Sequence, residues 1–307
     1  MRHIFDTMIQ KYILLFLFLF LFISFPAKGD NVVWHERGDV TYTLQDKVGT
    51  VVTKAANLFE DDMKALTGNR CHTSGQGEVA VYQLDLASNK ELKLLETMQV
   101  PLLKFITRTD AFWIGVRNKR IIIVGSNGRG AAYGLLELSR LSGVSPWKWW
   151  GDVTPRKRQR LEIDEQLDKI EAPSVEYRGI NMDNTQWSSA AWDKNYLKEQ
   201  LTDGRLGPAY YHKLFELMLR LRANTICAGW DKKRSDFLDV KGNRELADSF
   251  SIVVSAPYQD NAVTLYEHKK PIRVNLLWAD DGYGYMLARS NDDVKQGSHG
   301  AALYHLS

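Results

Sequence analysis

Two adjacent carboxylates, Asp280 and Asp281, follow an apolar segment and precede a turn that contains glycine. The segment from Ile272 to Ala279 predicts a strand, and parallel barrels place their catalytic side chains just beyond the carboxyl ends of strands. Because neighbouring side chains on an extended chain point in opposite directions, we expect one aspartate to face a cleft and the other to cap or pair. A carboxylate facing a cleft suits general acid–base catalysis. The alternative, a pair of turn or helix-capping aspartates, stays open.

A second strand end carries polar residues of the same kind. The segment from Tyr177 to Met182 predicts a strand, and Asp183 and Asn184 follow it directly, with Trp187 close behind. If both strands belong to one parallel sheet, their carboxyl ends share an edge. The sequence therefore predicts a polar site built from two separate strand ends.

Aromatic residues accompany both strand ends. Trp187 follows the first, and Tyr283 and Tyr285 follow the second, in a chain that holds 9 Trp, 13 Tyr and 12 Phe. Flat rings suit sugar-binding clefts, although they fill protein cores equally well. The run Ser145–Trp150 contains three Trp in four residues, and we expect it to plug a domain interface rather than to form a sugar platform.

The composition excludes several classes of protein. The chain has 307 residues, 44% hydrophobic and 25% charged, which indicates an ordinary globular protein of about two domains. Its net charge is +3, and residues 1–29 carry +2 of this, so the remainder lacks the bulk charge of a nucleic-acid binder. The seven His residues show no metal-ligand spacing, and no nucleophile elbow occurs. We expect neither a metal nor a cofactor.

The amino terminus predicts export. Residues 1–29 combine early basic residues, an apolar run from Tyr12 to Phe25 and small residues before Asp30, which is the pattern of a cleaved signal peptide. An uncleaved membrane anchor is the alternative, but the run is shorter than a bilayer-spanning helix requires. We expect a secreted or periplasmic protein with no membrane attachment after cleavage. The two cysteines, Cys71 and Cys227, are expected as free, buried thiols.

Strands and helices alternate along the mature chain, which predicts an α/β fold. We expect an N-terminal α/β domain over 30–151, a polar linker over 152–172 and a partial (β/α)8 barrel over 173–307. In the first domain, a helix is expected from Thr50 to Thr67, and a helix from Ala131 to Ser142 after the turn G-S-N-G-R-G. That turn departs from the dinucleotide and phosphate-loop fingerprints.

In the second unit, helices are expected at 208–222 and 244–250 and further strands at 223–228 and 251–256. A closed barrel takes about 250 residues, so 135 residues with about four strands predict half a barrel.

Six ordered segments resemble glycoside hydrolase family 115, the xylan α-glucuronidases. They span Ile122 to Val153, Tyr177 to Ile180, Gly207 to Ile226, Gly242 to Phe250, Asn275 to Met286 and Gly300 to Ser307. The chain resembles a shortened and divergent member of that family. The resemblance implies an α/β first domain, a (β/α)8 barrel and further domains. It also implies an inverting reaction that removes 4-O-methyl-glucuronic acid from glucuronoxylan.

An inverting glycosidase needs one carboxylic acid and one carboxylate about 6.5–9.5 Å apart. With this chemistry, Asp280 or Asp281 is expected to supply one catalytic group and Asp183 the other. Arg178, Asn184 and Asn224 are expected near the sugar, because a uronic acid needs a cationic or amide-rich pocket.

The alternative is a non-catalytic glycan-binding paralogue or a truncated gene remnant. Asn184 and Thr185 stand where the family carries an acidic pair, and a stretch expected between about Asp260 and Val263 is missing. Half a barrel has unpaired edges, so a homodimer that completes them is also an expectation.

Overall fold

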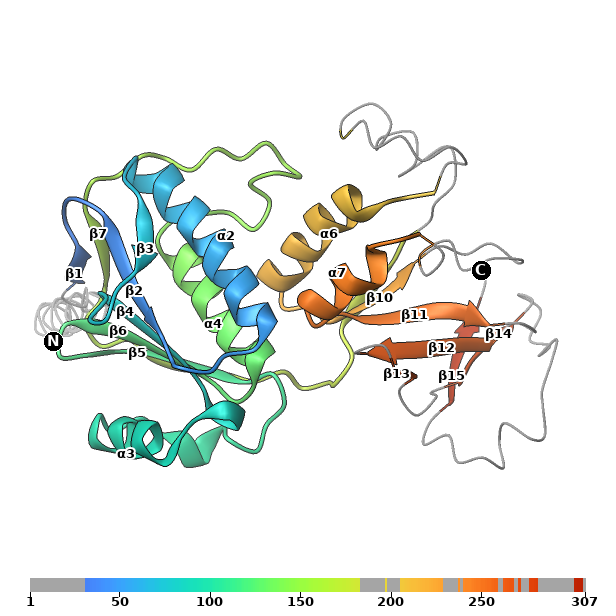
Figure 1. Ribbon diagram of the computed structural model, residues 1–307, viewed down its shortest axis with the longest axis horizontal. Coiled ribbons are helices and arrows are strands. Elements are labelled where there is room, and N and C mark those ends of the chain that lie inside the picture. Colours follow the sequence, from blue (N-terminus) through green and yellow to red (C-terminus); the bar gives the residue numbers. More distant parts are fainter. Residues whose placement is uncertain are drawn as a thin grey trace, which may run out of the picture.

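The protein is described by a computed structural model. The structure describes residues 31–182, 197, 205–228, 237 and 240–258, together with the backbone of short strands at 262–267, 270–271, 276–280 and 301–305. Two α/β units lie side by side, and the helices of the second unit face two helices of the first (Figure 1). This arrangement confirms the predicted α/β class. Within the described residues, no helix is long and apolar enough to span a bilayer.

A six-stranded sheet forms the centre of the first unit. In spatial order its strands are β3 (Cys71–Thr73), β2 (Val40–Leu44), β4 (Val79–Gln83), β6 (Arg120–Gly125), β5 (Phe112–Arg117) and β8 (Asp168–Glu171). The first four strands are parallel, and β5 runs antiparallel to both β6 and β8. A separate antiparallel pair joins β1 (Asn31–His35) to β7 (Leu161–Asp164). The polar stretch expected as a linker therefore contributes two strands to the first unit.

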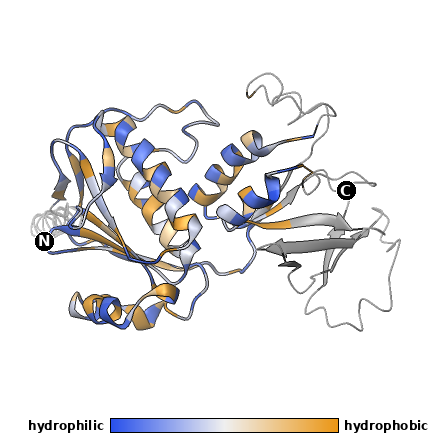
Figure 2. Ribbon diagram, viewed as in Figure 1, coloured by the Kyte–Doolittle hydropathy of each residue, from blue (hydrophilic) through white to orange (hydrophobic). Residues whose placement is uncertain are grey.

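Helices cover both faces of this sheet. The helices α2 (Thr50–Thr67) and α4 (Gly128–Leu141) lie together on one face, and α3 (Asn89–Thr97) lies on the other (Figure 1). The predicted helix from Thr50 to Thr67 is confirmed, and it ends because Gly68 adopts a left-handed conformation with φ of 80°. Apolar residues gather on the inner sides of α2 and α4 and along the strands (Figure 2). The short 3-10 turns η1 (Leu84–Leu86) and η2 (Leu102–Lys104) flank α3.

The helix α4 begins three residues earlier than expected, at Gly128 rather than Ala131. Asn127 caps it, since its Oδ1 accepts a hydrogen bond of 2.9 Å from the Gly130 amide. The glycine is needed there because a Cβ at position 130 would lie 2.1 Å from the Ala111 carbonyl oxygen. The glycine-rich segment thus forms a capped first helical turn.

The second unit starts as a βαβαβ arrangement. Its elements are β9 (Gly179–Met182), α6 (Pro208–Arg220), β10 (Thr225–Ala228), α7 (Asn243–Ser249) and β11 (Val253–Tyr258). The three strands pair in parallel with β10 in the middle, as a barrel segment requires. They are followed by β12 (Ala262–Glu267) and β13 (Lys270–Pro271), which pair antiparallel, while β14 (Leu276–Asp280) pairs in parallel with β15 (Ala301–His305). The strands from β9 to β13 form one open sheet, and β14 and β15 form a separate pair, so the described residues contain part of a barrel that they do not close.

One hydrophobic core runs through both units. It contains Phe59 of α2 and Leu135 of α4 together with Phe215 of α6 and Phe250 after α7. Trp150 seals the border, since its ring lies edge-on to Tyr210 and its Nε1 donates to the Lys213 carbonyl oxygen at 3.2 Å. The interface role predicted for this tryptophan-rich run is confirmed for Trp150.

Buried charges also join the units. Arg220 of α6 donates to both oxygens of Asp62 on α2, at 2.7 and 2.9 Å, and the two side chains are 3% and 0% exposed. Lys148 adds a third contact to Asp62 at 2.6 Å. On α4, Glu137 accepts hydrogen bonds from Arg140, Lys169 and Arg222. A buried carboxylate is tolerated only when it is paired, so these contacts bind the units to each other.

We expect Asp62→Ala to lower the free energy of unfolding by up to about 3–5 kcal/mol, because the buried Arg220 guanidinium loses two hydrogen bonds and keeps only Glu216 as a carboxylate partner. Urea unfolding followed by tryptophan fluorescence measures the change. Asp61→Ala is the matched control, since Asp61 is the exposed neighbour on the same helix, and it should shift stability by no more than about 0.5 kcal/mol. Equal losses in both variants would contradict the role assigned to Asp62.

Candidate functional site

The structure describes the two strands that precede the predicted carboxylates, and it places them in separate sheets. β14 ends at Asp280, which pairs with His305 of β15, and Asp281 is the next residue. β9 ends at Met182, level with Ala228 at the end of β10, and Asp183 follows it. The residues that lie outside the described part of the chain are Asp183, Asn184, Trp187, Asp281, Tyr283 and Tyr285. Their catalytic and sugar-binding roles stay predictions.

Two predicted substrate-binding residues, Arg178 and Asn224, are described, and the structure brings them together. They immediately precede β9 and β10, and the Arg178 amide donates to Asn224 Oδ1 at 2.9 Å. Arg178 Nη2 and Asn224 Nδ2 both donate to the same oxygen of Asp110, at 2.8 and 3.1 Å. Asp110 lies just before β5 in the first unit, so this cluster is part of the junction between the units.

The donors of Arg178 are committed to the protein. Nε donates to the Arg222 carbonyl oxygen and Nη1 to the carbonyl oxygens of Val175 and Glu176. Nη2 donates to Asp110 and, at 3.4 Å, to the Tyr133 hydroxyl. These contacts occupy every N–H of the guanidinium. They do not support the predicted role of Arg178 and Asn224 at a substrate, because the pair holds the starts of two strands in place instead.

Asp110 is the centre of this cluster, and sequence reasoning missed it. Arg129 Nε and Asn127 Nδ2 donate to its other oxygen at 2.8 and 2.9 Å. Burial raises the pKa of the Asp110 carboxyl, but Arg129 and Arg178 outweigh this effect and hold it below its ordinary value. No local pattern marks this residue in the sequence, because its four partners come from distant segments.

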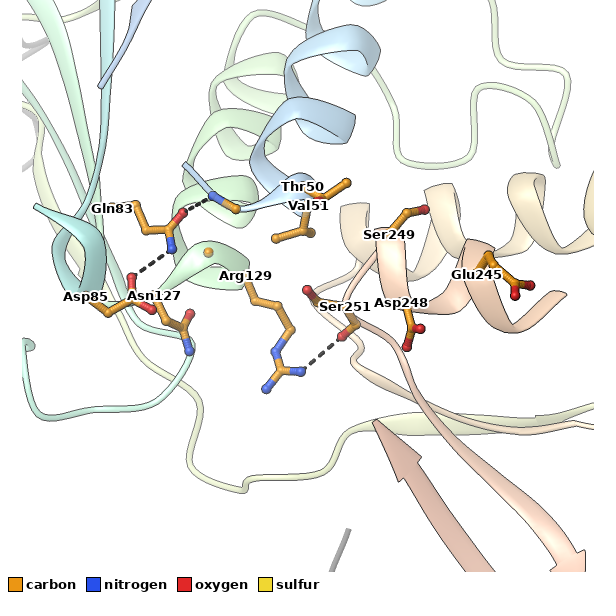
Figure 3. Close-up of a pocket in the computed structure, with 12 residues that line it drawn as sticks. Thr50, Val51, Gln83, Asp85, Asn127, Arg129, Glu245, Asp248, Ser249 and Ser251 are labelled. Atoms are coloured by element: carbon orange, nitrogen blue, oxygen red, sulfur yellow. Dashed lines mark hydrogen bonds between the residues drawn. The ribbon is translucent and has the colours of Figure 1, made fainter. Parts of the chain in front are cut away.

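A polar cleft of about 590 Å³ opens between the units. One wall consists of the first turns of α2 and α4 with the end of β4, and the other consists of α7 and the loop that follows it (Figure 3). Arg129 crosses between the walls, since its Nη1 donates to the Ser251 carbonyl oxygen at 3.0 Å. The lining residues are Gly49, Thr50, Val51, Gln83, Asp85, Asn127, Gly128, Arg129, Glu245, Asp248, Ser249 and Ser251. The sequence-based prediction did not include this cleft.

A second hollow of about 660 Å³ lies along the connection from β8 to β9. Asp110, Arg178 and Arg222 line it, and all three are engaged in the contacts described above. Over the described residues, no three His, Cys, Asp or Glu side chains are arranged to hold a metal ion. Cys71 is a free, buried thiol, as predicted.

Comparisons with known proteins define the class of the chain. Residues 170–264 match the sequence profile of Glycosyl hydrolase family 115. The solved structure of BtGH115A, a family GH115 4-O-methyl-α-glucuronidase with specificity for decorated arabinogalactans, superposes with a TM-score of 0.65 and 31% identity. The match covers 71% of this chain and 29% of that one. An α/β unit joined to part of a barrel is thus shared with a glycoside hydrolase. The chain belongs to glycoside hydrolase family 115.

Other structures overlap more loosely. A GH138 enzyme targeting pectin rhamnogalacturonan II gives a TM-score of 0.39 with 14% identity over 70% of this chain and 30% of its own. A mutant β-hexosaminidase of Streptomyces plicatus gives 0.46 with 12% identity over 88% and 54%. Both scores are too low to support an argument about this chain. No curated protein matches the sequence.

We expect acid to weaken the junction between the units. Burial raises the pKa of the Glu137 carboxyl, but hydrogen bonds from Arg140 and Lys169 and the charge of Arg222 bring it down to about 2. Because the pKa is lower in the folded state, this contribution is complete above the unfolded value and is lost as the pH falls from about 4.5 to about 2. The loss should amount to about 3 kcal/mol.

Thermal unfolding scans at a series of pH values test this expectation. Glu137→Gln should unfold at a lower temperature near neutral pH and should lose less stability on acidification than the unchanged protein. Glu96→Gln, at an exposed position of α3, is the control and should keep the original pH profile. An unchanged acid dependence in Glu137→Gln would refute the assignment.

Proposed function

We propose that the chain is a glycoside hydrolase that releases 4-O-methyl-glucuronic acid from decorated plant polysaccharides. The observation that carries the proposal is the superposition on a 4-O-methyl-α-glucuronidase at 31% identity over 71% of this chain. The strand ends at Asp280 and Met182 support it, since barrels place their catalytic groups beyond such ends. The chain spans less than a third of the length of that relative.

The proposed reaction inverts the anomeric centre. One carboxylic acid protonates the leaving oxygen while a carboxylate on the opposite face activates water. We assign one role to Asp280 or Asp281 and the other to Asp183. Trp187, Tyr283 and Tyr285 supply rings for stacking against the sugar. We expect a cationic residue other than Arg178 to bind the carboxylate of the uronic acid, because the N–H groups of Arg178 already donate to other residues of the protein.

Two polysaccharides are candidate substrates. Resemblance to the xylan α-glucuronidases favours glucuronoxylan, which we take as the first choice. Decorated arabinogalactan is the substrate named for the matched relative. Release of uronic acid from each polymer, separated by anion-exchange chromatography, decides between them.

We expect Asp281→Asn or Asp280→Asn to reduce the turnover of the preferred polymer by at least about 100-fold, because removing a general acid or base costs about 10²–10⁴ in rate. Asp183→Asn should cause a loss of the same order. Asp61→Asn, on the exposed side of α2, is the matched control and should retain full turnover. Unchanged rates in all three strand-end variants would overturn the site.

The second candidate function is glycan binding without hydrolysis. Asn184 and Thr185 favour it, since they stand where the family carries acidic residues and asparagine keeps the shape of a carboxylate without its proton. Calorimetric titration with acidic xylo-oligosaccharides separates the candidates. Heat of binding without release of uronic acid supports this second function, whereas turnover refutes it.

We also propose export, based on the signal-type sequence of residues 1–29. Expression in a bacterial host followed by fractionation should recover the protein outside the cytoplasm. Its amino-terminal sequence should begin at Asp30. Cytoplasmic protein that retains Met1 would contradict the proposal. The homodimer stays a prediction.

A further inference from the structure

The cleft between the units lies at a topological switch point of the first sheet, between β2 and β4. β2 and β4 are adjacent and parallel. The chain leaves β2 for α2 on one face of the sheet and leaves β4 for α3 on the other (Figure 1). Connections that diverge in this way open a crevice beyond the carboxyl ends of the strands, which is where open α/β sheets bind ligands. Gly49, in the connection from β2 to α2, and Gln83, at the end of β4, both line the cleft.

A buried glutamine shapes this wall. Gln83 is 3% exposed, its Oε1 accepts from the Gly49 amide at 2.7 Å, and its Nε2 donates to Asp85 Oδ1 at 2.8 Å. Gln45 holds the backbone of Gln83 from the other side through two hydrogen bonds. Hydrogen bonds to neighbouring residues therefore fix the positions of the polar groups on this wall.

The two walls differ in chemistry. The first presents donors, namely the Thr50 hydroxyl and the backbone amides of the first helical turn of α2, beside the Arg129 guanidinium, which already donates to Asp110 and Ser251 (Figure 3). The second presents acceptors, the carboxylates of Glu245 and Asp248 (Figure 3). Sugar hydroxyls both donate and accept, so a sugar ring can use both walls at once. An anion fits poorly, because the cleft holds three carboxylates, with Asp85 the third, against one arginine.

We propose that this cleft binds an uncharged segment of the polysaccharide backbone, apart from the catalytic end. Its volume of about 590 Å³ is within the usual range for ligand sites. Ser251 precedes β11, so the cleft lies near the amino-terminal end of that strand, whereas Asp280 stands at a carboxyl end. The choice of a sugar as the occupant rests on the proposed function; the cleft itself does not. The site would hold the polymer while its side chains are processed elsewhere.

Calorimetric titrations of the full chain test the proposal, with xylohexaose and β-1,3-galactohexaose as separate neutral probes and sodium glucuronate as the charged comparison. We expect at least one neutral probe to bind and glucuronate not to compete with it. Asp248→Ala, which removes an acceptor, and Thr50→Trp, which fills the cleft, should each weaken this binding at least fivefold. Circular dichroism confirms that both variants fold.

Matched control variants test whether the weaker binding in Asp248→Ala and Thr50→Trp arises in the cleft. Asp61→Ala and Thr97→Trp alter exposed residues of α2 and α3 outside the cleft and should leave binding unchanged. Release of uronic acid from a short soluble substrate should be equal in all four variants, so a failure of the proposed function shows in this assay and not in the titrations. Absence of heat with both neutral probes, or affinities unchanged in Asp248→Ala and Thr50→Trp, overturns the inference.

Discussion

The architecture depends on three buried carboxylates of the first unit that meet arginines of the second. Asp62 pairs with Arg220, Glu137 with Arg222 and Asp110 with Arg178. Each carboxylate is buried, so losing the arginine of the second unit would leave a buried charge without the partner that offsets the cost of its burial. Because one hydrophobic core also runs through both units, the α/β domain and the partial barrel form a single structure.

The junction between the units determines which strand ends remain available for a functional site. The cluster around Asp110 takes up Arg178 and Asn224 at the starts of β9 and β10, and it fixes these two strands relative to the first unit. The opposite, carboxyl ends of the strands are left for chemistry. The same junction encloses the polar cleft, since Arg129 bonds both to Asp110 and to the loop before β11. Anchoring and cleft formation are thus two results of one set of contacts.

Local patterns predicted the helices and strands well where the spacing of apolar residues determines the structure. The α2 helix was expected with the bounds that it has, and the strands β9 and β10 were expected within two residues of their observed bounds. Prediction failed where a partner was needed. Asn127 starts α4 early by capping it, and β8 forms because β5 offers an edge for pairing, although its own residues are polar. The Asn127 cap is a local signal that the prediction overlooked, whereas the unpaired edge of β5 cannot be recognised from local composition.

By itself, the sequence determined the α/β class, the order of its elements and the ends of β9 and β14 to within one residue, because hydrophobic periodicity and turn residues act over a few neighbouring positions. It also carried the family resemblance. Only the tertiary structure decided that Arg178 and Asn224 serve the junction, that Asp110 lies at its centre and that a polar cleft opens beside it. These features join residues far apart in the chain, and only folding brings such groups within hydrogen-bond distance.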